Sequence, residues 1–95
     1  MTTALWVLMN LFIVADWGQT RYVAKSPQYY ETNPILGEKP SVAKVNKYFI
    51  GVLAVNNGIM IALPDKYKPY YAGIVTTVEA GYVAHNNSIG IKISF

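Results

Sequence analysis

The chain contains no cysteine, which excludes disulfide-stabilised folds, cysteine-based zinc sites and thiol nucleophiles. Its one histidine, His85, is too few for a metal centre built on several imidazoles. Only 14% of the 95 residues are charged, whereas an average soluble domain has about 25%. The hydrophobic content of 53% excludes an intrinsically disordered chain, and the length allows one domain, residues 1–95.

Charged side chains are missing from three long stretches of the sequence. Residues 1–15 and 48–64 carry none, and residues 69–91 carry only Glu79. In a small soluble domain every helix has a wet face, so charge is spread along each helix. Here the charge is confined to the connections, and each stretch with its flanks approaches the length of about 20 residues that spans a bilayer. We therefore expect an integral membrane protein.

Start and stop signals divide the chain into three helices. Thr3 is a candidate N-cap, and no proline occurs before Pro27. Pro40 and Pro64 bracket the second apolar stretch, and Pro69 suits the first turn of a third helix. The predicted segments are a helix at about 3–25, a loop at 26–41, helices at about 42–63 and 69–87, and a tail at 88–95. The expected fold is all-α, with three transmembrane helices in a small bundle and an ordered loop between the first two.

Three other interpretations stay open. A secretory signal at the N-terminus has no basic residue before Arg21 to support it, and cleavage after Ala15 would place Ile13 where a small residue is needed. The alternating C-terminus S-I-G-I-K-I-S-F resembles the closing strand of an outer-membrane barrel, with residues 72–85 as its hairpin partner. However, 95 residues barely supply eight strands, and residues 4–15 do not alternate. The third alternative is a soluble helical domain with unusually apolar helices.

Aromatic and basic residues predict the topology. Tyrosines flank both connections, as they do at bilayer interfaces: Tyr22, Tyr29, Tyr30 and Tyr48 at the long loop, and Tyr67, Tyr70 and Tyr71 at the short one. The loop and C-terminal side carries Arg21, Lys25, Lys39, Lys44, Lys47 and Lys92, and the other side Lys66 and Lys68. By the positive-inside rule the N-terminus lies outside and the C-terminus is cytoplasmic, in a bacterial inner membrane. No basic stripe follows a helix, so nucleic acid is not an expected partner.

Polar residues recur within all three predicted helices. The candidate intramembrane polar network is Asp16, Thr20, Asn57, Glu79, His85 and Asn86. Ionisable groups inside a span are costly, so they usually face partners within a bundle. We favour interhelical hydrogen bonding as their role over a proton relay or an ion path. The sequence has no glycine-rich phosphate loop, Ser-His-Asp order or metalloprotease motif, and predicts no catalytic, cofactor-binding or metal-binding residues.

The long loop contains Y-Y-E-T-N-P-I-L-G, which differs from a flexible linker rich in glycine and serine. Its candidate structural residues are Glu31, Asn33 and Pro34. We expect the Asn-Pro pair to form a turn and the loop to fold against the cytoplasmic ends of the helices. Ile35 and Leu36 should insert into apolar surface, and Glu31 should meet Arg21 or Lys25.

A resemblance is carried by D-W-G-Q-T-R followed by E-T-N-P-I-L-G. This pattern resembles small uncharacterised three-span integral membrane proteins of bacteria and their phages, which have an Asp and a Thr four residues apart late in a first span and then an Asn-Pro. The marked residues here would be Asp16, Thr20, Asn33 and Pro34. The resemblance covers about residues 14–37 and implies membrane class and bacterial or phage origin, with no activity.

The function that we expect is that of a small non-enzymatic polytopic membrane protein, in contact with membrane lipid and without a cofactor. It would act by helix association with itself or with a larger membrane partner, because small residues suited to close packing recur in the second and third helices: Gly51, Gly58, Gly73 and Gly81. The alternative is a phage holin-like permeabiliser, which shares the span number and orientation. The chain lacks the highly charged C-terminal tail usual in holins.

Overall fold

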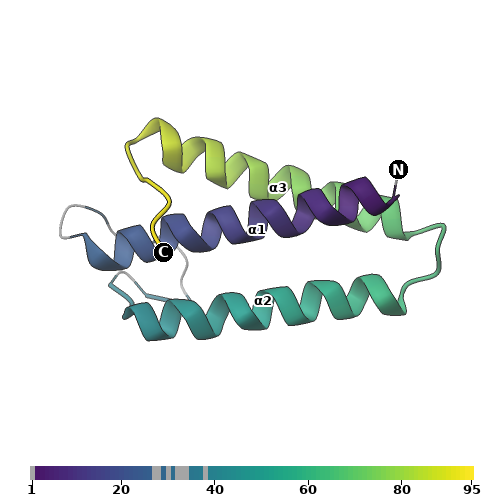
Figure 1. Cartoon of the computed structure of the whole chain (residues 1–95), viewed down its shortest axis with the longest axis horizontal. Coiled ribbons are helices and arrows are strands. Elements are labelled where there is room, and N and C mark those ends of the chain that lie inside the picture. Colours follow the sequence, from purple (N-terminus) through teal and green to yellow (C-terminus); the bar gives the residue numbers. More distant parts are fainter. Residues whose placement is uncertain (1, 27–28, 30, 32–34, 38) are drawn as a thin grey trace.

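The computed structural model describes residues 2–26, 29, 31, 35–37 and 39–95. Within these residues the chain forms three helices and no strand: α1 (Thr2–Lys25), α2 (Val42–Ala62) and α3 (Lys68–Ser88). The all-α, three-helix prediction is confirmed, and each helix end lies within one residue of its expected position. The alternative hairpin at 72–95 is wrong, because residues 72–85 lie inside α3. The helices lie lengthwise in a molecule of 44 × 25 × 21 Å (Figure 1).

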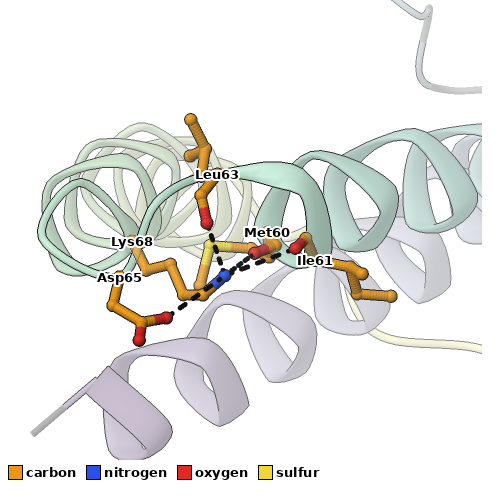
Figure 2. Close-up of polar contacts among 5 residues, drawn as sticks. All are labelled: Met60, Ile61, Leu63, Asp65 and Lys68. Atoms are coloured by element: carbon orange, nitrogen blue, oxygen red, sulfur yellow. Dashed lines mark hydrogen bonds and ion pairs between the residues drawn. The ribbon is translucent and has the colours of Figure 1, made fainter.

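Both ends of α2 are closed by side chains. At its start the Ser41 hydroxyl accepts a hydrogen bond of 3.1 Å from the Lys44 amide, which would otherwise lack an intrahelical partner. At its end the Lys68 ammonium donates to the carbonyl oxygens of Met60 at 2.6 Å and Leu63 at 2.7 Å (Figure 2). A cation at these carbonyls also complements the negative end of the helix dipole. Lys68 therefore fixes the turn between α2 and α3.

Helix α1 is the centre of the bundle. It packs extensively against both α2 and α3, whereas α2 and α3 touch each other little. In Figure 1 α2 and α3 are closest near the turn that joins them and move apart toward the other end. The buried core consists of Met9 and Ile13 from α1, Val45, Phe49 and Met60 from α2, Ala72 from α3 and Leu36 from the loop. The divergence of α2 and α3 leaves space beside α1 at the loop end.

The C-terminal tail runs back along α1 (Figure 1). The Ser94 amide donates a hydrogen bond of 3.0 Å to the Gly18 carbonyl, and the Phe95 ring lies edge-on to Trp17 at 5.9 Å between centroids. A Cβ atom at Gly18 would lie 2.5 Å from Cγ2 of Ile93, well inside van der Waals contact. The missing side chain of Gly18 is thus what lets the tail approach α1.

The loop prediction is right for one of its two apolar residues. Leu36 is 2% exposed and belongs to the core, but Ile35 is 71% exposed, so the expected insertion of Ile35 is wrong. A segment of two adjacent residues cannot direct both side chains into the same surface when the chain turns there. Asn33 and Pro34 lie outside the described residues. Arg21 and Lys25 both donate to Ser94 of the tail, at 3.2 Å and 3.0 Å.

The outward faces of the helices are apolar. The exposed large hydrophobic side chains include Val7, Leu8, Leu11 and Val14 on α1, Ile50, Val55 and Ile61 on α2, and Tyr70, Ile74, Val78 and Tyr82 on α3. By length and composition, α2 is the one helix among the described residues that is apolar enough to cross a membrane. Polar residues interrupt the other two helices. Membrane crossing by α1 and α3 therefore stays a prediction.

Candidate functional site

Amide side chains join α1 to α2 near the end where the N-terminus lies. Asn10 Nδ2 donates to Asn57 Oδ1 at 3.0 Å, and Asn57 Nδ2 donates back to Asn10 Oδ1 at 2.8 Å. The indole N–H of Trp6 donates to the same Asn57 oxygen at 2.7 Å. Because Trp6 and Asn10 are one helical turn apart, both reach one residue on the facing helix.

A second polar contact joins the same two helices near the loop. Asn46 Oδ1 accepts from the indole N–H of Trp17 at 2.9 Å and from Arg21 Nη1 at 2.7 Å. The Arg21 guanidinium also lies 5.8 Å from the centre of the Phe95 ring. Arg21 thereby links α2, α1 and the tail, and its charge lies on polar groups of the protein.

Helix α3 is bound to its neighbours by three further side chains. Gln19 of α1 is almost fully buried and donates to the Val83 carbonyl at 3.1 Å. Its side-chain oxygen accepts from Asn86 Nδ2 at 3.1 Å. On the other side of α3, the Tyr71 hydroxyl donates to Asn56 Oδ1 of α2. Each helix pair therefore has at least one side-chain hydrogen bond.

A cavity of about 560 Å³ lies where α2 and α3 diverge. Its wall comes from all three helices, the loop and the tail: Asp16, Thr20, Val23, Glu31, Leu36, Tyr48, Phe49, Val52, Glu79, Tyr82, His85, Asn86, Ile89 and Ile91. This volume is within the range of small-molecule sites, about 300–1,000 Å³. The cavity is therefore the candidate functional site.

Two carboxyl groups meet in this wall. Asp16 of α1 and Glu79 of α3 are hydrogen-bonding partners, which requires one of the two groups to carry a proton. The Thr20 hydroxyl donates to the Asp16 carbonyl at 2.8 Å and lies 3.4 Å from Asp16 Oδ1. Among the described residues, Glu79 Oε2 and Thr76 Oγ1 are buried without a hydrogen-bond partner. The pair is thus incompletely satisfied by protein groups.

The predicted polar network falls into two places. Asp16, Thr20, Glu79, His85 and Asn86 line the cavity. Asn57 does not line it and instead bonds to Asn10 in the separate α1–α2 contact. The helical spacing of these residues indicated a face for each one. It gave no information on the height at which the three helices meet.

Several polar contacts were missed by the sequence analysis. The network does not include Trp6, Asn10, Trp17, Arg21 and Tyr71, although all five bond across helices. The four-residue spacing of Trp6 and Asn10 was a usable signal. Tyr71 gave none, because a tyrosine near a connection also fits a membrane interface.

The described residues place no three His, Asp or Glu side chains where they could share a metal ion. No protein-family model matches the chain, and no curated protein or solved structure is detectably similar to it. The resemblance to small bacterial and phage membrane proteins therefore stays a prediction. The arguments that follow depend on the geometry alone.

Proposed function

We propose that the chain is a small three-span membrane protein of a bacterial inner membrane, with its N-terminus outside and its C-terminus in the cytoplasm. The observation that carries the membrane assignment is the distribution of polarity. Asparagine, glutamine and acidic side chains point between the helices, whereas large apolar side chains cover their outer faces. Lipid favours this arrangement, since polar groups in a bilayer need partners within the protein.

The dimensions and charges agree with that assignment. The long axis of 44 Å matches a bilayer with its headgroups, about 40–45 Å. Helices of 24, 21 and 21 residues are about 30–36 Å long, enough to cross the hydrocarbon layer. Lys68 lies at the boundary, and its ammonium reaches the carbonyls at the end of α2. The positive-inside rule supports the orientation, because most basic residues lie at the loop end.

Within the membrane the protein would act by helix association, most simply with a second copy of itself. The outer face of α3 has an open groove of about 420 Å³, lined by Pro69, Tyr70, Gly73, Ile74, Thr77 and Val78. Gly73, Thr77 and Gly81 recur every four residues, and no atom lies within 4 Å of a Cβ built on either glycine. Small residues at this spacing let two helix backbones approach closely in lipid.

A non-enzymatic role agrees with the use of the polar side chains. Most of them hold one helix to another, as Asn10 and Asn57 do, and leave no nucleophile beside a base. The proposed partners are therefore lipid on most of the surface and another helix on the Gly73–Gly81 face.

Disulfide cross-linking in membranes tests the association, and the cysteine-free chain gives a clean background. Ile74→Cys places a thiol beside the groove, and Val55→Cys places one on the equally exposed face of α2. We expect Ile74→Cys to form a covalent dimer and Val55→Cys to form at least fivefold less. Adding Gly73→Leu should abolish the Ile74→Cys dimer, whereas Gly51→Leu on α2 should not. Equal cross-linking at both positions, or none at Ile74→Cys, would contradict self-association through α3.

A further inference from the structure

The cavity is negatively charged in a chain that is positively charged as a whole. Asp16, Glu31 and Glu79 line it, and among its described lining residues there is no lysine or arginine. The formal net charge of the chain is +3, so the acidic lining is a local property. Arg21, one turn from Asp16, turns away toward Asn46 and Ser94. The cavity therefore attracts a cation, and no cation of the protein fills it.

Aromatic rings form much of the remaining wall. Tyr48 and Phe49 come from α2, and Tyr82 comes from the facing side of α3. Phe49 is held in place by Trp17, which stacks on it at 6.2 Å, and by Tyr48, which meets it edge-on at 5.0 Å. Aromatic faces attract cations through their quadrupole, most strongly where water is excluded. Aromatic walls beside carboxylates are the combination that recognises organic ammonium groups.

An unsatisfied atom supports a ligand at this place. Glu79 Oε2 has no solvent access of note and no hydrogen-bond partner among the described residues. A buried polar atom without a partner costs free energy, which a bound donor or cation recovers. Glu79 belongs to the wall of the cavity, so a ligand in the cavity can reach the carboxyl group.

An inorganic ion fits these features less well than an organic one. Divalent metals need several converging oxygen or nitrogen ligands, and no three acidic or histidine side chains of the described residues are so placed. A volume of about 560 Å³ is also far larger than an ion. We propose that the cavity binds an organic ammonium cation, with its charge between Asp16 and Glu79 and its apolar part against Tyr48, Phe49 and Tyr82. The cation can be a free amine or the ammonium group of a lipid.

Calorimetric titration of the full chain in a non-ionic detergent tests the proposal. Benzyltrimethylammonium is the cationic probe, and neopentylbenzene, in which carbon replaces the nitrogen, is its uncharged analogue of equal shape. We expect saturable binding of the cation and at least tenfold weaker binding of the analogue. Equal binding of the two compounds, or no binding of the cation, would overturn the proposal.

Substitutions locate the bound charge. Glu79→Gln keeps the size and polarity of the side chain, and we expect it to weaken binding of the cation at least tenfold. Tyr82→Leu, at an exposed part of the wall, should weaken binding about threefold to tenfold and is the variant to use if Glu79→Gln does not fold. Asp65→Asn removes a carboxylate from the turn outside the cavity and should change nothing. Unchanged binding in folded Glu79→Gln and Tyr82→Leu would place the cation elsewhere.

Lipid competition separates the two sources of the ammonium group. Repeating the titration in nanodiscs of phosphatidylglycerol, which has no ammonium group, should preserve binding of the probe. If added phosphatidylethanolamine lowers the apparent affinity, the natural occupant is a lipid headgroup; if it does not, the occupant is a free cation. Loss of probe binding in phosphatidylglycerol discs would contradict the site in a membrane. None of these results depends on the cross-linking of α3.

Discussion

Asn10 of α1 and Asn57 of α2 exchange two hydrogen bonds, at 3.0 Å and 2.8 Å, so that each amide is both donor and acceptor to the other. The pair uses its polar groups on one another and on Trp6, which also donates to Asn57. Such a contact holds two helices together where hydrophobic burial between them gives little driving force, as in lipid. It also fixes the register of α1 against α2, because a shift by one residue breaks both bonds.

The first prediction concerns this pair. Asn10→Ala and Asn57→Ala should each lower the free energy of unfolding in detergent, and a double-mutant cycle should give a coupling energy of about 0.6–2 kcal/mol. Asn87→Ala, at an exposed position near the end of α3, is the matched control and should have little effect. Additive effects of the two substitutions would show that the amides do not act as a pair.

The second prediction concerns the end of α2. Lys68→Met removes the ammonium that three carbonyl oxygens accept from, at Met60, Ile61 and Leu63, while it keeps a side chain of similar length (Figure 2). We expect a loss of about 1–3 kcal/mol in unfolding free energy, because the carbonyls lose a charged donor. Lys66→Met, at an exposed residue of the same turn, should be close to neutral. Equal effects of the two would remove the capping role of Lys68.

The third prediction concerns the tail. Gly18→Ala puts a methyl group 2.5 Å from Ile93 and 2.7 Å from the Phe95 ring, so the tail has to move away from α1. The Ser94 amide would lose its bond to the Gly18 carbonyl, and its hydrogen exchange measured by NMR should accelerate at least tenfold. Gly51→Ala adds the same methyl group to α2 in open space and should leave Ser94 unchanged. Unchanged exchange in Gly18→Ala would show that the tail does not depend on this contact.

The helices were predictable from the sequence because local signals mark their ends. Pro40 and Ser41 precede α2, Pro64 follows it, and Pro69 lies in the first turn of α3. Leu36 could be assigned to the core from its hydrophobicity, but Ile35 beside it could not be told apart. Which of two neighbouring apolar residues turns inward depends on the backbone of the loop, and composition does not record it.

The candidate site was predictable only in part. The four-residue spacing of Asp16 and Thr20, and the positions of Glu79 and Asn86, place each pair on one helix face. That these faces enclose a cavity follows from the divergence of α2 and α3, which no local pattern encodes. The same holds for the tail, whose path depends on a glycine 76 residues before Ser94. The holin-like alternative stays a prediction, because it concerns behaviour in cells and not geometry.

The central claim is that all three helices cross the membrane, and labelling of single cysteines in intact bacteria with a membrane-impermeant maleimide tests it most directly. The chain has no cysteine of its own, so each introduced thiol reports one position. Suitable exposed sites at the ends of the helices are Thr3, Lys25, Lys66 and Lys92. We predict that Thr3→Cys and Lys66→Cys react in intact cells, whereas Lys25→Cys and Lys92→Cys react only after the inner membrane is permeabilised. Reaction of Lys66→Cys and Lys92→Cys from the same side would contradict the crossing of α3 and with it the three-span account.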